Sequence, residues 1–284
     1  ASGLAPARVE LVGRSAILRI RSKSLGAAAL LAALSKRADI AYAEPNFVVH
    51  AFTEPNDPLF PQLWGLARVE AAEAWDATVG SAANVVAIVD TRIDYTHTDL
   101  APNVWSAPAA FTVTIGGVSI VCQAGTHGFN AIARTCDPRD DHNHGTHVSG
   151  TIGAAGNNAL GVAGVNWIAS LMGLKFLDST GTGTVADAID AIEFALQAKQ
   201  AFAATGGANV RILSNSWGGG DFSQALLDQI NAANDQEMLF VAAAGNNGLP
   251  NDLFPTYPAS YNAANVVAVA ATTSTDTRAY FSNY

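Results

Sequence analysis

Charged residues are scarce in this chain, and no hydrophobic stretch is long. Only 14% of the 284 residues are charged, whereas 49% are hydrophobic. That balance is typical of a well-packed globular protein and not of a disordered or nucleic-acid-binding one. The most apolar stretches, such as Asn84–Val89 and Asn265–Ala271, have the length of β-strands. No run reaches the roughly 18 residues that a membrane span needs, so we expect no membrane partner.

Cysteine is also scarce, with only Cys122 and Cys136 in the chain. Neither a Cys-x-x-Cys pair nor a Cys/His metal spacing is present, which removes the usual sequence signs of a zinc site. Two interpretations stay open. The two residues are free buried thiols, or they form one disulfide bond, which would indicate an oxidising compartment.

Basic residues are concentrated near the start of the chain. Residues 1–53 hold seven Lys and Arg against three Asp and Glu, whereas residues 54–284 hold eight against 21. The first segment therefore has a formal charge of +4 and the second a charge of −13. This asymmetry indicates two units that attract each other, and it argues against nucleic acid as the partner of the larger one.

The same two segments differ in their hydrophobic patterns. Residues 1–53 predict a small α+β unit in which Leu25–Lys36 is helical, and the proline-containing loop Phe52–Pro61 marks its end. Across residues 54–284, apolar strand-sized runs alternate with helical segments such as Thr184–Ala201. That order predicts an α/β domain with a doubly wound parallel sheet. The strand candidates are Val85–Val89, Leu171–Leu177, Val210–Ser214, Met238–Ala243 and Val266–Ala270.

Three segments at the predicted strand ends carry residues suited to catalysis, because chemistry in such sheets gathers at the carboxyl ends of the strands. Asp90 directly follows a strand in VVAIVDTRID, where it could orient an imidazole. His144 begins a helix of small residues in DDHNHGTHVSGT and could act as a general base. Asn246, in VAAAGNNG, could direct its amide at a developing oxyanion. Taken singly, Asp90 could be a cap residue and Asn246 a simple turn.

The histidine-rich string also suggests a metal site. His144 and His147 are three residues apart, and Asp140 and Asp141 lie nearby. A zinc-peptidase motif, however, needs a Glu after the first His and a second His four residues on. Because Gly145 follows His144, that motif is absent.

The order of the strings is more specific than any one of them. D-T-x-I-D at Asp90, HGTHVSGT at His144, SNSWGGG at 214–220 and AAGN before Asn247 together resemble the subtilisin family of serine peptidases. The similarity runs from about Asn56 to Tyr284. It implies a serine endopeptidase in which Asp90 and His144 are the triad acid and base.

The resemblance implies further sites. Asn246 would be the oxyanion-hole amide, and Tyr257-Pro258 matches a turn that holds a cis proline in the family. Two edge segments would bind an extended peptide by strand addition, and oxygen ligands would hold a structural Ca²⁺ ion. The implied substrate-binding residues are Gly181, Thr182, Gly183, Ser216, Trp217 and Gly218. The implied calcium ligands are Asp57, Asp99 and the side chain of Asn158, with the carbonyls of Leu160 and Val162.

Residues 1–53 resemble the second half of the family's inhibitory propeptide, which ends as a product-like strand in the active site. The implied partners are protein or peptide substrates and the protein's own propeptide. Cleavage is expected between about His50 and Asn56. The resemblance also implies a secreted protein, which agrees with the disulfide interpretation of the two cysteines. It further implies a monomer.

Two departures from the family pattern support a competing interpretation, an inactive peptide-binding pseudoprotease. Arg92 stands where the family has glycine, two residues from Asp90, and a positive φ there would cost about 1–3 kcal/mol. The family's nucleophile string, G-T-S-M-A, does not occur, and by the family's spacing it is expected beyond Tyr284. We therefore expect a fragment of an endopeptidase that is inactive by itself, because triad members act as a unit.

Overall fold

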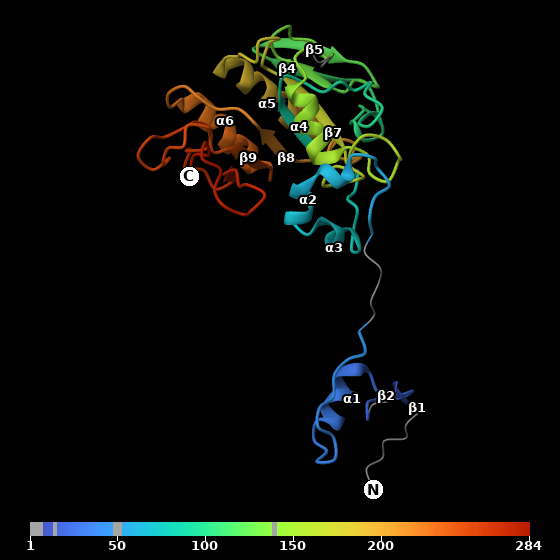
Figure 1. Ribbon diagram of the computed structural model, residues 1–284. Helices are drawn as coiled ribbons and strands as arrows, with labels where there is room; N and C mark the ends of the chain where they lie inside the picture. Colours follow the sequence, from blue (N-terminus) through green and yellow to red (C-terminus); the bar gives the residue numbers. More distant parts are fainter. Residues whose placement is uncertain (1–7, 14–15, 48–52, 138–140) are drawn as a thin grey trace. The chain divides into compact units, whose positions relative to one another are not determined.

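The chain divides into two compact units, residues 1–51 and 52–284, in a computed structural model (Figure 1). In the smaller unit, β1 (Arg8–Leu11) pairs antiparallel with β2 (Leu18–Arg21), and α1 (Ala27–Leu34) confirms the predicted helix. The structure describes residues 8–13, 16–47, 53–137 and 141–284. Residues 50–52 of the predicted cleavage region and Asp140 lie outside these ranges.

A six-stranded parallel sheet forms the centre of the larger unit. Its strands follow the order β10-β9-β8-β3-β7-β6, and every neighbouring pair is parallel. The strands are β3 (Val85–Asp90), β6 (Gly128–Asn130), β7 (Leu171–Lys175), β8 (Val210–Asn215), β9 (Leu239–Ala243) and β10 (Val266–Val269). The five predicted strands are confirmed, and β6 was missed because three residues give no periodic pattern. All carboxyl ends therefore lie along one edge of the sheet.

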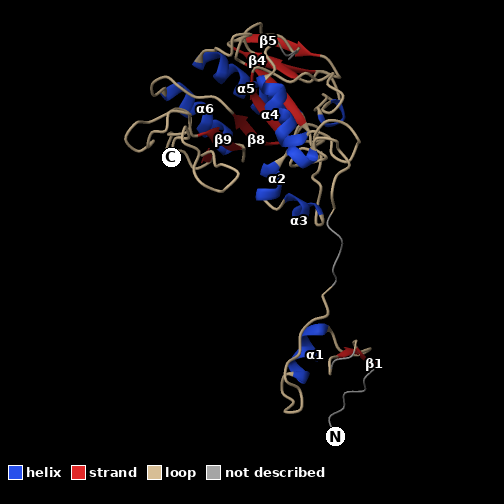
Figure 2. Ribbon diagram, viewed as in Figure 1, coloured by secondary structure: helices blue, strands red, loops and turns tan. Residues whose placement is uncertain are grey.

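Helices cover both faces of this sheet (Figure 2). They are α4 (His144–Gly153), α5 (Val185–Ala201) and α6 (Gln224–Asp235). Alternate residues of β3 separate the two faces: Ala87 and Val89 share a core cluster with α5 and α6, whereas Ile88 packs on the side of α4. The doubly wound prediction is confirmed. Because strand residues alternate between faces, Asp90 lies on the same face as Ile88, which is the face that α4 covers.

Local sequence sets where the two long helices begin. The Thr184 hydroxyl accepts a hydrogen bond from the Asp187 N–H before α5, and the Ser223 hydroxyl accepts one from the Leu226 N–H before α6. Such caps satisfy backbone donors that a helix start leaves unpaired.

The larger unit also has short helical elements. They are η1 (Phe60–Gln62), α2 (Trp64–Arg68), α3 (Ala71–Trp75) and η2 (Ala101–Asn103).

A disulfide-linked hairpin flanks the sheet. Strands β4 (Phe111–Ile115) and β5 (Val118–Cys122) pair antiparallel, and Cys122 at the end of β5 is bonded to Cys136. Of the two alternatives for the cysteines, the structure therefore has the disulfide. Within the described ranges, no helix combines the length and the apolar character needed to cross a membrane.

Candidate active site

A buried carboxylate and an exposed imidazole form the centre of the site. Asp90, the last residue of β3, is fully buried, and its Oδ1 lies 2.7 Å from Nδ1 of His144. His144 is the first residue of α4, and its side chain is 44% exposed. Since a carboxylate only accepts hydrogen bonds, we assign the Nδ1 proton to this contact. The Nε2 atom is then free to accept a proton from a substrate or nucleophile.

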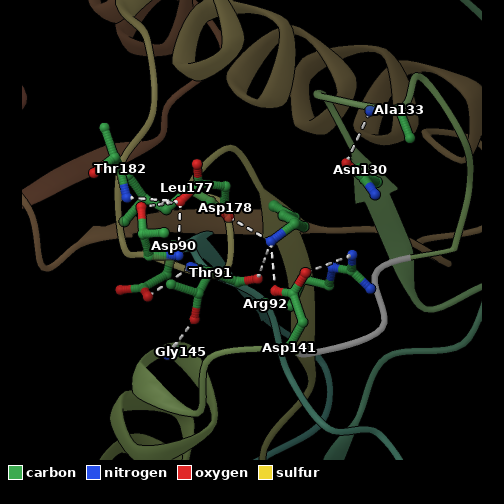
Figure 3. Close-up of polar contacts among 12 residues, drawn as sticks. Asp90, Thr91, Arg92, Asn130, Ala133, Asp141, Gly145, Leu177, Asp178 and Thr182 are labelled. Carbon is green, nitrogen blue, oxygen red and sulfur yellow. Dashed lines mark hydrogen bonds and ion pairs between the residues drawn. The ribbon is translucent and has the colours of Figure 1, made fainter.

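The start of α4 is fixed directly against the end of β3. The Gly145 N–H donates to the Thr91 hydroxyl at 2.9 Å, and Figure 3 shows Thr91 pointing at Gly145. A Cβ atom on Gly145 would lie well inside van der Waals contact of the Arg92 carbonyl oxygen. Glycine is therefore required for His144 to approach Asp90 this closely. Thr91 was missed as a site residue, although it stands inside the D-T-x-I-D string.

Arg92 has a positive backbone φ of 131°, which is the condition under which the sequence predicted strain at this position. A non-glycine residue in this conformation is strained by about 1–3 kcal/mol. Its side chain is largely buried, and its Nη2 lies 3.9 Å from Oδ2 of Asp141. The strain leaves the hydrogen bond between Asp90 and His144 intact.

One exposed edge segment carries Gly181, Thr182 and Gly183 after β7. Gly183 forms an antiparallel bridge with Leu177, and a Cβ there would clash with the Phe176 carbonyl oxygen. Gly181 has a φ of 76°, which favours glycine. The segment can thus offer its backbone to an extended peptide.

Asp178 shapes the turn that leads into this edge. Its Oδ1 accepts from the Thr180 hydroxyl at 2.6 Å, the Thr180 N–H at 2.8 Å and the Thr182 N–H at 3.1 Å. These hydrogen bonds, that of the Thr180 hydroxyl foremost, lower the pKa of Asp178. The turn therefore keeps its charged acceptor down to acidic pH and loses it only as the pH falls through that lowered pKa.

The second edge segment carries Ser216, Trp217 and Gly218 after β8. The Trp217 ring is half-buried and packs edge-on against the Phe176 ring, with centroids 4.7 Å apart. Phe176 directly precedes Leu177, which bridges to the first edge. This contact connects the two segments that the sequence assigned to substrate binding.

Asn246 lies in the exposed loop after β9, on the same carboxyl edge as Asp90. Its side chain makes no hydrogen bond to any described residue. The loop itself is held by Asn283, whose Oδ1 accepts from the Asn247 N–H at 2.8 Å. The peptide bond between Tyr257 and Pro258 is cis.

The predicted calcium residues gather around the loop 157–162. Asp57 and Asp99 are each only 3% exposed. The Asn157 N–H donates to Oδ2 of Asp57 at 2.6 Å, whereas Oδ1 is buried without a hydrogen-bond partner among the described residues. The described part of the chain has no cluster of three or more His, Cys, Asp or Glu side chains suited to a metal.

Comparison with known proteins identifies the fold and the family. The structure resembles a protease of Pseudoalteromonas arctica with a TM-score of 0.63 and 28% identity, over 82% of this chain and 70% of that one. A serine proteinase of Bacillus sp. (strain AK1), described as thermophilic, is 35% identical over 90% of this chain and 55% of its own length. Thermitase of Thermoactinomyces vulgaris is 34% identical over 81% of this chain and 70% of its own.

The chain thus spans little more than half of one of these relatives and about two thirds of the other. The model of the subtilase family matches residues 81–284, which include Asp90, His144 and Asn246. The agreement of family model, relatives and fold shows that this chain belongs to the subtilase family of serine peptidases.

Proposed function

We propose that this chain provides the acid, the base and the oxyanion donor of a serine endopeptidase. The hydrogen bond between Asp90 and His144 at the carboxyl edge of the sheet is the observation that carries this proposal. His144 Nε2 takes the proton of a serine hydroxyl as it attacks the substrate carbonyl, and then gives that proton to the leaving amine. Asp90 holds the imidazole in one tautomer and stabilises the imidazolium. The nucleophilic serine comes from sequence outside residues 1–284.

The substrate is an extended segment of protein, bound between the two edge segments. Gly181–Gly183 and Ser216–Gly218 offer backbone groups for strand addition on either side of it. The contact between Phe176 and Trp217 keeps the two edges at a fixed spacing. Such binding recognises the main-chain groups of the substrate rather than one side chain. It therefore suits an endopeptidase, which binds internal segments of a protein chain.

The oxyanion role of Asn246 has a direct kinetic test. Replacing Asn246 by alanine in the full-length protein should lower kcat about 10²–10³-fold, because the amide acts on charge that develops only in the transition state. KM should change little. Asn247→Ala, a change one residue along, is the matched control and should leave kcat within a fewfold. Equal effects of the two changes would contradict the assignment.

We also propose a structural Ca²⁺ site at the loop 157–162. Asp57 and Asp99 are buried carboxylates that form no ion pair with a described residue, and a buried charge without a partner is costly. Several oxygen donors from separate segments match the preference of Ca²⁺. Asp99 accepts from the Asn158 side chain at 2.8 Å and from the Val162 N–H at 2.9 Å.

The remaining ligands of the proposed site need only local adjustment. Oδ1 of Asn158 accepts from the Leu160 N–H at 2.8 Å, so its second lone pair or a rotated amide would face the ion. The carbonyls of Leu160 and Val162 would complete the set. Bound Ca²⁺ would stabilise this loop and take no part in the reaction.

Calcium should raise the stability of the full-length protein. At a Ca²⁺ concentration of about 100 Kd, the free energy of unfolding should increase by about 2.7 kcal/mol. Thermal unfolding with Ca²⁺ and with a chelator measures the effect. Asp57→Asn should remove most of it, whereas Asp252→Asn, at an exposed position, should not. A melting temperature that is the same with Ca²⁺ and chelator would exclude the site.

The smaller unit fits the role of an inhibitory propeptide, so we propose a zymogen that is processed after folding. Its charge of +4 complements the −13 of residues 54–284. The disulfide between Cys122 and Cys136 supports secretion into an oxidising compartment. We propose that the processed enzyme acts as a monomer.

A further inference from the structure

We propose that Lys175 is a positioning residue, which joins the Asp90–His144 pair to the substrate-binding edge with Asp141 as its counterion. This inference rests on the proposed peptidase function and assigns a role to a residue outside the triad. Lys175 does not touch the reacting atoms. It acts by holding three segments of the chain in one arrangement.

The burial of Lys175 is the first observation. Every residue of β7 is buried, and Lys175 at its end is only 3% exposed. Burying an ammonium ion is costly unless it is paired and hydrogen-bonded, and an apolar residue of similar size would avoid that cost. The charge is therefore expected to perform a task that packing alone would not.

The contacts of the ammonium group define this task. Lys175 Nζ lies 2.7 Å from Oδ1 of Asp141, 2.5 Å from the Leu177 carbonyl oxygen and 3.4 Å from that of Thr91. These three acceptors belong to three different segments: the one that leads into α4, the end of β7 and the end of β3. The ammonium ion has three protons, so each acceptor can receive one.

Each of the segments leads to a part of the site. Thr91 follows Asp90, and Asp90 is the Cα partner of Lys175 in the sheet. The Asp90 carbonyl oxygen accepts hydrogen bonds from the N–H groups of Phe176 at 3.1 Å and Leu177 at 3.4 Å. Leu177 in turn bridges to the first substrate edge. The ammonium group thus contacts the residue that follows Asp90 and the residue that bridges to the substrate edge.

Asp141 connects the same ion to the catalytic base. It stands three residues before His144, and its carboxylate binds Lys175 through Oδ1 and approaches Arg92 through Oδ2. Figure 3 shows Arg92 and Asp141 side by side at the end of β3. The strained Arg92 therefore supplies a second cation to the carboxylate. The Asp141 carboxylate thus lies near two cations, Lys175 at the end of β7 and Arg92 just after β3. These contacts restrict how far the segment leading into α4 can shift.

Loss of the ammonium ion should act on turnover more than on substrate binding. The backbone pairing of the sheet, the bridge between Leu177 and Gly183 and the hydrogen bonds of Asp178 do not use the ammonium group of Lys175, so the substrate edge should persist. The segment before His144 would lose the ion pair between Asp141 and Lys175. Because a misplacement of about 1 Å can cost about 10²-fold in rate, we expect kcat to fall about 10–100-fold. KM should stay within about threefold.

The experiment compares Lys175→Met, Asp141→Ala and the double variant in the full-length protein. Lys199→Met is the matched control, because Lys199 also donates to a backbone carbonyl, that of Val210, but at the amino end of β8. Steady-state kinetics on a peptide substrate give kcat and KM. Proton NMR of the Nδ1–H of His144 reports the hydrogen bond to Asp90 without turnover.

The proposal predicts that both single variants lower kcat, that the double variant is no slower than Lys175→Met, and that the Nδ1–H signal broadens or shifts. Lys199→Met should leave all of these unchanged. Asp141 is exposed, so its variant tests the proposal even if Lys175→Met fails to fold. An active wild type with unchanged kcat and NMR signal in Asp141→Ala would overturn it. If the wild type had no peptidase activity but Lys175→Met still changed the Nδ1–H signal of His144, the proposed function would be refuted and the positioning role would stand.

Discussion

Alanine in place of His144 should abolish peptide hydrolysis by the full-length protein, with kcat reduced at least about 10⁴-fold. In the proposed mechanism His144 is the general base for the serine and the acid for the leaving amine, and neither step has a substitute group in the described site. Release of the N-terminal unit, seen as a shift in mass on a gel, should stop as well. Steady-state kinetics on a peptide substrate give the size of the loss.

His147 provides the matched control for this change. It lies three residues further along α4, and its side chain is exposed. His147→Ala should leave kcat within about tenfold, because the imidazole that bonds Asp90 belongs to His144. If His144→Ala kept wild-type hydrolysis and processing, the assignment of the base would be wrong.

The second large effect is expected from Gly145→Ala. The added Cβ would strike the Arg92 carbonyl oxygen, which is backbone and has no rotamer by which to move away. Either α4 separates from the end of β3 or the strand shifts, and we expect a loss of about 3 kcal/mol in the free energy of unfolding. The same displacement would lengthen the contact between Asp90 and His144.

Gly150 allows the same substitution on the same helix without the clash. No heavy atom outside its own helix neighbourhood lies within 4 Å of a Cβ at Gly150. Gly150→Ala should therefore raise stability by about 0.5–1 kcal/mol, since alanine favours helix more than glycine does. Denaturant unfolding of both variants in a His144→Ala background avoids self-digestion. Similar values for the two variants would show that the close approach is not required.

The pairing of Asp90 with His144 could be predicted from the sequence because both residues lie inside specific strings. Asp90 follows an apolar run that is long enough to predict a buried strand, and His144 precedes the small residues of α4. The parallel sheet also follows from alternation of strand-sized and helical segments, since its central strands β3 and β7 are buried on both faces. These signals are local, so no knowledge of distant contacts is needed.

The supporting residues could not be found in this way because their partners are set by the register of the sheet. In the sequence, Lys175 is only a charged residue within an apolar run. The pairing of β3 with β7 is what places it beside Asp90. Asn283 is far in sequence from the loop of Asn246 that it holds. Strand β6 is short and acquires its place by pairing with β7. The sequence signal for Lys175 was a charge in an otherwise apolar strand.

The most direct test of the central claim is covalent labelling of the full-length protein by a fluorophosphonate, which forms a bond to an activated serine oxygen with loss of fluoride. Mass spectrometry of the digested protein then locates the label. We predict one labelled serine, outside residues 1–284, and no label in the His144→Ala variant. A folded wild type that takes up no label, or a label that persists without His144, would contradict the account.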